Sequence, residues 1–341
     1  MRIGVLCPSE IAFRRFMPAL MQTDFEYIGL AVNSPEERFG NPLPDESTVE
    51  EMLEIEKRKA LSFVDAYGGK LFLSYDDLIH SEMIDAVYIP LPPGLHFMWS
   101  KKALEAGKHV FVEKPATVSL ADTKELISFA KEKKLAFHEN YMFNYHSQLD
   151  EIEEIIKSGS LGTVRLYSVK FGFPLRFGND FRYIKSLGGG SLIDAGGYCI
   201  KYATRLLGGK PEVAYAQLSA ESGFKVDMYG SGALRNRDGQ VVQISFGMDN
   251  DYRCELEVWG SKGTLRTGRV LTAPVGFEPM LTISRNGVIE ERKLSSDDAF
   301  KKSIETFRLC MESEKERDKN YQEIETQALL VEEFARKAGI I

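Results

Sequence analysis

The first pattern that could do chemistry lies at residues 7–12. A short apolar run, 2–6, turns there into a helical pattern. A dinucleotide phosphate site uses such a strand, turn and helix with the spacing G-x-G-x-x-G/A, because the backbone and the helix amides must approach the pyrophosphate. The three positions fall on Cys7, Ser9 and Ala12, so only the small third residue is retained. The pattern leaves two readings: a phosphate site in which the Ser9 hydroxyl adds a hydrogen bond, or a plain structural turn.

A carboxylate and a phenol form the second pattern. Asp194 and Tyr198 stand four residues apart in the run GGGSLIDAGGY, 188–198, so they share one face if the run is helical. A free phenol titrates near about 10, which is too high for proton transfer at neutral pH, but a cation within a few ångströms lowers that pKa. Lys114 is a candidate for the cation. The alternatives are a half-buried helix tyrosine and an N-terminal capping role for Asp194.

The elements that must position these residues alternate between strand and helix over the first 140 residues. We expect strands at 2–6, 27–32, 85–91, 109–113 and 136–138, and helices at 11–21, 50–67, 96–106 and 119–133. This order predicts a Rossmann-type doubly wound parallel sheet in a first domain, 1–140. Ligands bind such a sheet beyond the carboxyl ends of its strands.

The pattern changes in the second domain, 141–341. After a helix at 148–157, strand-like runs occur at 164–173, 212–220, 225–235, 241–248, 252–259 and 279–284, and Asp238-Gly239 and Asn286-Gly287 are hairpin signals. Run 252–259 alternates between apolar and charged residues. We therefore expect a mainly antiparallel sheet with one covered face, whose aromatic outer face could contact another copy of the chain.

Composition excludes several classes of protein. The 341 residues carry 43 Lys and Arg against 50 Asp and Glu, a formal net charge of −7, and no basic stripe suggests a nucleic-acid partner. No apolar run reaches the roughly 18 residues of a membrane span, and the first residues lack a signal region, so we expect a cytoplasmic protein with no membrane partner. The four cysteines are far apart, which predicts reduced thiols and no metal site.

The charge is local. Segment 36–56 holds eight acids and one base, Arg38, and the rest of the chain is neutral. The segment follows the second expected strand, where the cofactor ribose would lie. It is either a solvated flap or helix start without a ligand role, or an acidic lip that repels a 2′-phosphate and favours NADH.

Two long motifs resemble hallmarks of the Gfo/Idh/MocA (glucose-fructose oxidoreductase / inositol dehydrogenase) family. They are AGKHVFVEKPA, 106–116, and GGGSLIDAGGY, 188–198. Within the family, the motifs are most similar to those of sugar-nucleotide C-3 ketoreductases, and the segments that carry this likeness are 11–15, 88–99, 139–143, 179–183, 188–201, 244–252 and 259–265. The resemblance implies a Rossmann domain, an open-faced α/β domain, NAD or NADP as cofactor, and a homodimer or homotetramer. Segment 36–56 resembles an insertion relative to the family.

The resemblance also implies roles for single residues. Lys114 is the active-site lysine that stabilises alkoxide charge, Tyr198 stands where many members carry histidine, and Asp194 orients the substrate or the tyrosine. The cofactor-binding residues are Cys7, Pro8, Ser9, Glu10, Ile11, Asn33, Ser34, Leu91, Pro92, His96, Glu113, Lys114 and Arg182. Asn33 selects neither NAD nor NADP, since an acid there would favour the first and an arginine the second.

Three functions follow as hypotheses. The leading one is reduction of a keto group on a nucleotide-linked sugar by NAD(P)H, with a small-molecule sugar nucleotide as substrate. The second is an NAD(P)-dependent dehydrogenase of a free sugar, polyol or dihydrodiol. The third, motivated by the missing glycines, is a non-catalytic dinucleotide- or sugar-binding regulatory protein.

Overall fold

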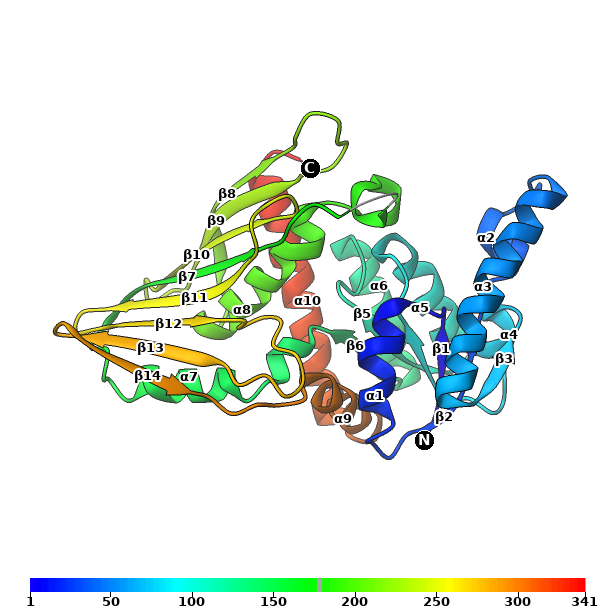
Figure 1. The fold of residues 1–341 in the computed structure, drawn as a ribbon, viewed down its shortest axis with the longest axis horizontal. Coiled ribbons are helices and arrows are strands. Elements are labelled where there is room, and N and C mark those ends of the chain that lie inside the picture. The colour runs from blue at the N-terminus through cyan, green and yellow to red at the C-terminus, as the bar shows by residue number, and fades with distance from the viewer. Residues whose placement is uncertain (177–179, 341) are drawn as a thin grey trace. The chain divides into compact units, whose positions relative to one another are not determined.

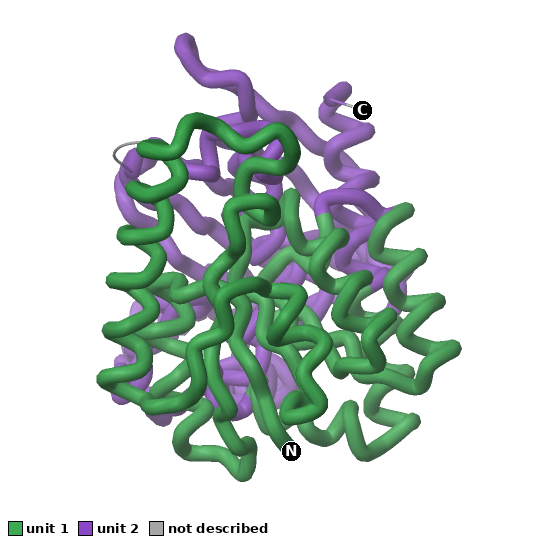
Figure 2. The backbone as a smooth tube through the Cα atoms, turned by 90° about the vertical axis from the view of Figure 1, so that its right-hand side faces the viewer, with its two compact units in different colours: residues 1–117, 121–140, 303–324 green, residues 118–120, 141–302, 325–341 purple. Residues whose placement is uncertain are grey.

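A computed structural model describes residues 1–176 and 180–340, which fold into two compact units. The first contains residues 1–117, 121–140 and 303–324, and the second contains 118–120, 141–302 and 325–341 (Figure 2). Residues 303–324, which the expected division placed in the second domain, therefore return to the first unit.

A six-stranded parallel sheet forms the centre of the first unit, with strand order β3-β2-β1-β4-β5-β6 (Figure 1). This is the strand order of a Rossmann fold, with its switch point between β1 and β4. The strands are β1 (Arg2–Leu6), β2 (Glu26–Ala31), β3 (Lys70–Phe72), β4 (Ala86–Ile89), β5 (His109–Glu113) and β6 (Phe137–Asn140).

Helices flank this sheet. They are α1 (Met17–Leu20), α2 (Pro35–Phe39), α3 (Glu46–Tyr67), α4 (Tyr75–Ile79), α5 (His96–Glu105) and α6 (Leu120–Lys133), with parts of α9 (Ala299–Glu312) and α10 (Glu314–Lys337). A π-helical turn, Ala12–Phe16, precedes α1. Phe16 stacks on Tyr88 of β4 and lies against Phe111 of β5, so the helix that follows the first turn is anchored in the core.

Helix α10 donates hydrogen bonds to backbone carbonyl groups at the edge of the parallel sheet. Asn320 Nδ2 donates to the Phe137 carbonyl at 2.7 Å, and the Tyr321 hydroxyl donates to the Leu135 carbonyl. Polar backbone groups of an edge strand need such partners. These contacts explain why residues 303–324 belong to the first unit.

An eight-stranded sheet forms the second unit, with order β14-β13-β12-β11-β7-β10-β9-β8. All neighbouring pairs are antiparallel except β7 and β10. The strands are β7 (Val164–Gly172), β8 (Glu212–Ser219), β9 (Tyr229–Arg235), β10 (Val241–Gly247), β11 (Arg253–Gly260), β12 (Thr264–Gly268), β13 (Met280–Arg285) and β14 (Val288–Lys293).

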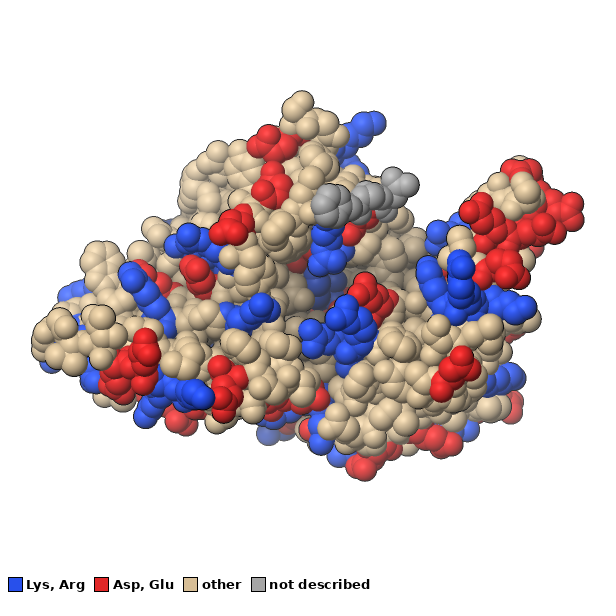
Figure 3. Space-filling model, in the orientation of Figure 1, with Lys and Arg blue, Asp and Glu red and all other residues tan. Residues whose placement is uncertain are grey.

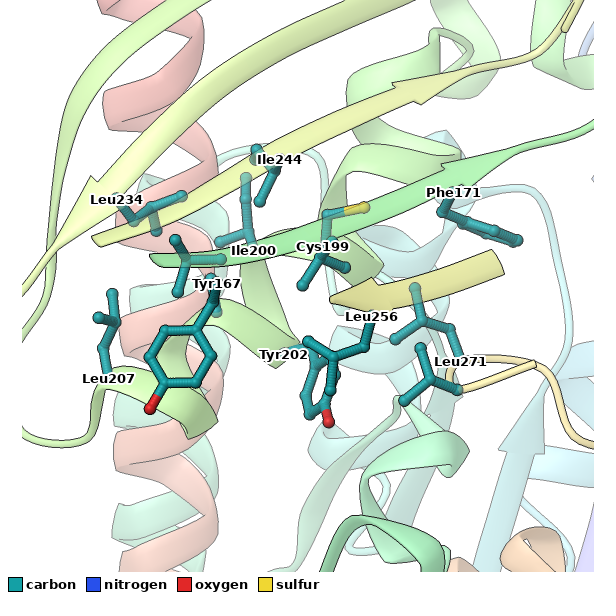
Figure 4. Packing of buried hydrophobic residues seen from close by; sticks show 14 of the residues in the cluster. Tyr167, Phe171, Cys199, Ile200, Tyr202, Leu207, Leu234, Ile244, Leu256 and Leu271 are labelled. Carbon is teal, nitrogen blue, oxygen red and sulfur yellow. The ribbon is translucent and has the colours of Figure 1, made fainter. Parts of the chain in front are cut away.

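One face of this sheet is covered. Helix α8 (Gly197–Leu207) packs on β7 and β10, and α7 (Gln148–Lys157) also contributes apolar side chains to the core. Figure 4 shows α8 side chains such as Cys199 and Ile200 facing Ile244 and Leu256 of the sheet. Along β11, Cys254, Leu256 and Val258 are buried, while Trp259 on the other face is exposed. The prediction of one covered face is confirmed.

The α/β fold class is confirmed, and most expected elements lie within one or two residues of the observed ones. Both hairpin signals join antiparallel strands, β9 to β10 and β13 to β14. Expectation and structure differ at three places. The helix expected at 11–21 begins with a π turn, the strand expected from 225 begins at Tyr229, and the helix expected from 50 begins at Glu46, where Asp45 caps it. The strands and α-helices not predicted are β3, β12, β14, α2, α4, α9 and α10.

Most of the acids in segment 36–56 lie on the surface of α2, the loop after it and the first turns of α3. Figure 3 shows them as a red cluster at the end of the first unit. Two acids are exceptions, because Glu56 is buried and Glu37 hydrogen-bonds to the backbone. The four cysteines are free. Among residues 1–176 and 180–340, no helix is long and apolar enough to cross a membrane, and no group of three His, Cys, Asp or Glu residues is arranged to hold a metal ion.

Candidate functional site

The carboxyl ends of four adjacent strands carry the cofactor-binding residues predicted in the first unit. Strands β2, β1, β4 and β5 are neighbours in the sheet and run parallel. The predicted residues follow them in order: Cys7 to Ile11 after β1, Asn33 and Ser34 after β2, Leu91, Pro92 and His96 after β4, and Glu113 and Lys114 at the end of β5. The topology thus brings these segments to one edge. Arg182, Asp194 and Tyr198 belong to the second unit.

The turn after β1 has the backbone of a glycine turn without the glycine. Cys7 has φ +82°, in the region that favours glycine. The Ser9 N–H donates to the Cys7 carbonyl at 2.8 Å, and Ser9 Oγ accepts from the Ala12 N–H at 3.2 Å, so the serine caps the helix. Burial raises the pKa of the Cys7 thiol to about 11. The thiol is therefore neutral at pH 7 and places no negative charge against a pyrophosphate.

The segment after β2 is built around Glu37. Its carboxylate accepts N–H bonds from Ser34 at 2.7 Å and from Tyr75 and Asp76 at 3.0 Å, so it links the starts of α2 and α4. Asn33 is 7% exposed, and within the described part of the chain its Oδ1 has no hydrogen-bond partner. A buried amide oxygen at the end of β2 fits a donor from a bound ribose.

The segment that carries Lys114 is held by side chains on both sides. Before it, Glu113 Oε1 accepts from the Tyr88 hydroxyl and from Asn140 Nδ2, both at 2.7 Å. Burial raises the pKa of Glu113, while those two hydrogen bonds and Lys114 oppose the rise. After it, the Ala116 N–H donates to Glu139 Oε1 at 2.8 Å. The Lys114–Pro115 peptide bond is cis.

His96 differs from the expectation for a cofactor ligand. The residue is fully buried, its Nδ1 lies 2.7 Å from the Pro115 carbonyl oxygen, and its Nε2 lies 2.7 Å from the Leu91 carbonyl oxygen. Both ring nitrogens are therefore engaged with the backbone of its own unit, so the ring positions two loops and offers a ribose no atom.

In the second unit, the first three glycines of run 188–198 permit close approach. Gly188 is left-handed with φ +78°. A Cβ on Gly189 would lie 2.4 Å from the Arg182 carbonyl, and one on Gly190 would lie 2.4 Å from Asp227 Oδ1. The Asp227 carboxylate accepts from the Ser191 hydroxyl at 2.6 Å and the Leu192 N–H at 2.7 Å. Glycine therefore lets segment 180–184 lie directly against the start of the helix.

That approach brings Arg182 to Asp194. Arg182 Nε donates to Asp194 Oδ2 at 2.6 Å, and its Nη1 donates to Asp180 Oδ1 at 3.1 Å. All three side chains are at most 17% exposed. Asp194 lies in a π-helical turn, Leu192–Gly196, directly before α8. Removing one partner of such a buried pair costs about 3–5 kcal/mol, because the other charge is left uncompensated. Arg182, expected near the cofactor, thus positions Asp194.

Tyr198 lies on the first turn of α8 in an aromatic cluster. Its ring centroid is 5.3 Å from Tyr141, 5.6 Å from Phe143 and 5.2 Å from Phe171. Gly197 makes room for this packing, because a Cβ there would lie 2.2 Å from the Tyr141 hydroxyl. The ring of Tyr198 is therefore fixed while the residue stays partly exposed.

Several residues that build the site were not predicted from the sequence. Tyr88, Asn140 and Glu139 hold the Lys114 segment, and Asp180 holds Arg182. Asn140 and Tyr141 lie in segment 139–143, which the family resemblance already singled out without assigning them roles. The first residue of segment 179–183 lies outside the described residues.

Both units of the chain match known protein families. Residues 25–141 match the model of the oxidoreductase family with an NAD-binding Rossmann fold, and residues 149–266 match the GFO/IDH/MocA C-terminal domain. A dTDP-3,4-didehydro-2,6-dideoxy-α-D-glucose 3-reductase from Saccharopolyspora spinosa is 35% identical over 309 residues, which cover 90% of this chain and 86% of that protein. A D-xylose 1-dehydrogenase (NADP+) from Haloferax volcanii is 27% identical over 92% of this chain and 90% of that protein.

Solved structures agree with these matches. A 3-ketoreductase from Actinomadura kijaniata in complex with NADP and TDP-benzene superposes with a TM-score of 0.86 at 32% identity, covering 97% of this chain and 96% of that one. Variants of that enzyme with a tyrosine changed to phenylalanine, or a lysine changed to glutamate or alanine, have also been crystallised. The chain described here belongs to the GFO/IDH/MocA family of oxidoreductases.

Proposed function

We propose that this protein reduces a keto group on a nucleotide-linked sugar with NADPH. The observation that carries the proposal is the 35% identity, over 90% of the chain, to a dTDP-sugar 3-reductase. The local geometry supports it, since each unit fixes one residue suited to carbonyl reduction: Lys114 at the end of β5 and Tyr198 on α8.

The residues after β1 and β2 fit a dinucleotide. Cys7 adopts the backbone conformation of the missing glycine, its thiol is neutral, and Asn33 offers a buried acceptor oxygen. A bound nicotinamide dinucleotide would supply the hydride. The turn 7–9 and the loop at Leu91 and Pro92 would hold it, as ligands bind a doubly wound sheet at this edge.

The chain's own residues would handle charge and protons. Tyr198 gives its phenolic proton to the substrate oxygen as that oxygen becomes an alkoxide. The Lys114 ammonium stabilises the developing negative charge. Asp194 stays in its ion pair with Arg182 and orients this end of the helix. These roles require Lys114 and Tyr198 to serve the same carbonyl.

The substrate class is tested by comparing turnover on two sets of compounds. We expect kcat/KM with NADPH to be at least 100-fold higher for a 3-keto sugar linked to dTDP than for any reaction with free xylose, glucose, inositol or a dihydrodiol. The nucleotide supplies binding energy that free sugars lack. A preference for a free sugar would support the dehydrogenase alternative, and absence of NADPH and NADH binding by fluorescence titration would support the regulatory one.

The catalytic roles are tested by Tyr198→Phe and Lys114→Ala. We expect each to lower kcat by about 10²- to 10⁴-fold, because a proton donor or a charge-stabilising group is lost. The double variant should lose far less than the product of the two effects, since groups that act on one carbonyl are not additive.

Tyr202→Phe is the matched control. Tyr202 lies one helical turn further along α8, is fully buried, and its hydroxyl has no hydrogen-bond partner among the described residues. Its kcat should equal that of the wild type. Full turnover by Tyr198→Phe would remove Tyr198 from the mechanism.

We also propose that the cofactor preference is for NADPH and that Arg38 carries it. Arg38 is exposed on α2, and its charge opposes the rise in the pKa of Cys7 that burial and, to a smaller extent, Glu56 cause. Lys59 on α3 acts on Cys7 in the same sense. Among the acids that follow β2, Glu37 is occupied by three backbone N–H groups. The solved ketoreductase from Actinomadura kijaniata contains NADP.

Arg38→Ala should weaken NADPH binding about tenfold and leave NADH binding within about twofold, because only NADPH carries the 2′-phosphate. Fluorescence titration at low and moderate salt measures both dissociation constants. Arg237→Ala, an exposed arginine of the second unit, is the charge-matched control. Tighter binding of NADH than NADPH by the wild type would restore the acidic-lip reading of segment 36–56.

We further propose that the uncovered face of the eight-stranded sheet packs against a second copy of the chain in a homodimer or higher homo-oligomer. Trp259 and Tyr229 are 58% and 39% exposed there. Small side chains, Ser168, Ser231 and Ser245, alternate with the buried positions. Arg266 Nε on this face donates to Glu257 at 2.5 Å. Exposed aromatic side chains beside such a paired charge suit a symmetric contact.

Trp259→Asp should convert this oligomer to a monomer, because an unpaired carboxylate would be buried at the contact. Light scattering after size-exclusion chromatography measures the mass of both proteins. Leu73→Asp, which changes a 69% exposed leucine of the first unit, should leave the mass unchanged. A monomeric wild type, or a Trp259 variant of unchanged mass, would contradict the proposal.

A further inference from the structure

His96 lies between two backbone carbonyls, and a neutral imidazole can donate to one of them only. Carbonyl oxygens accept hydrogen bonds and never donate, whereas the neutral ring has one N–H and one bare nitrogen. The two nitrogens lie at equal distances, 2.7 Å, from the Pro115 and Leu91 oxygens. Burial, with a smaller contribution from Lys114, lowers the pKa of His96 to about 4, so the ring carries one proton at pH 7. The single N–H of the ring therefore donates to the carbonyl of one loop only.

The two loops differ in how many other hydrogen bonds hold them. The loop after Leu91 closes itself, because the Leu95 N–H donates to the Pro92 carbonyl at 2.9 Å. The segment after Lys114 has no N–H at Pro115. It is held by side chains from outside, by Glu139 at the Ala116 N–H and by His96 at the Pro115 carbonyl.

We infer that His96 is a positioning residue for Lys114: its Nδ1–H donates to the Pro115 carbonyl and fixes the segment in which the lysine side chain is rooted. Helix α5, which begins at His96, packs on β4 and β5. The ring therefore connects the segment to a helix that is itself held against the sheet. The inference rests on the proposed function, because it assigns Lys114 a role in catalysis.

Two amide variants separate the two contacts. The amide nitrogen of Asn and Nδ1 of His are each two bonds from Cβ, whereas the amide nitrogen of Gln and Nε2 of His are each three bonds away. His96→Asn therefore keeps a donor toward Pro115, and His96→Gln keeps one toward Leu91. We expect kcat of the Gln variant to be at least tenfold lower than that of the Asn variant, because a displacement of about 1 Å at a catalytic group costs up to about 10²-fold.

The Kd for NADPH and the midpoint of thermal unfolding should differ little between the two variants, since each retains one polar contact. A purely structural role would lower kcat in step with stability and would not rank Asn above Gln. His80→Asn is the control, because among the described residues the His80 ring bonds only the Asp76 carbonyl of its own helix. Equal kcat values for the Asn and Gln variants, or the reverse order, would overturn the inference.

A second measurement does not depend on any substrate. Nitrogen NMR of protein labelled at its five histidines, with His96→Asn used to identify the resonances, reports which ring nitrogen is protonated. We expect a protonated Nδ1 and a bare Nε2, and the opposite tautomer would overturn the inference. If the wild type fails to reduce any keto sugar while Nδ1 is protonated, the proposed function fails and the hydrogen bond stands.

Discussion

The hydrogen bonds that hold the Glu113 carboxyl group inside the parallel sheet are the interaction on which the first unit's site depends. Burial disfavours a charged carboxylate, and bonds from Tyr88 and Asn140 offset that cost. The three residues come from β5, β4 and β6, so the end of the central strands is tied across the sheet. Lys114 is the next residue, so the same hydrogen bonds limit the movement of its backbone. The backbone from which the flexible lysine side chain extends is therefore fixed, and charge stabilisation requires such a fixed position.

The second unit achieves the same result with a different device. Its helix start is fixed by the absence of side chains at Gly189, Gly190 and Gly197 rather than by a buried acid. These gaps admit the Arg182 backbone, the Asp227 carboxylate and the Tyr141 hydroxyl. The same three residues make contacts around Asp194 and Tyr198: Arg182 Nε bonds Asp194, the Asp227 carboxylate accepts from the Leu192 N–H, and the Tyr141 ring packs on Tyr198. The glycines of the motif are therefore explained by close approach, and a phosphate need not be invoked here.

Much of the fold was predictable because periodicity reports burial. Parallel strands such as His109–Glu113 and the hairpins at Asp238-Gly239 and Asn286-Gly287 carry strong local signals. The three-residue strand β3 is too short for a periodic signal. The place of residues 303–324 depends on contacts distant in sequence, in which Asn320 bonds to β6 and Tyr321 bonds to Leu135 just before it.

Candidate site residues could be named where a motif carries them, but their contacts could not be predicted. Lys114, Asp194 and Tyr198 could be named from motifs. The contacts of His96 could not be predicted, because its two carbonyl partners come from different loops. The same holds for Cys7. The sequence reports a missing glycine, while the structure retains the glycine conformation at φ +82°.

The acidic segment 36–56 shows that a net charge does not predict cofactor preference unless the position of each charged group is known. Counting makes it the origin of the −7 charge of the chain, and its place after β2 suggests repulsion of a phosphate. Yet Glu37 accepts hydrogen bonds from three backbone N–H groups, and the Glu56 carboxylate pairs with Lys59 at 3.1 Å. The remaining acids are exposed, where water and salt screen charges beyond about 10 Å. Charges of both signs reach the turn after β1, because Glu56 raises the pKa of Cys7, and Lys59 and Arg38 each lower it by less. The position of each charge, and not the sum over the segment, therefore sets the electrostatic field at this edge of the sheet.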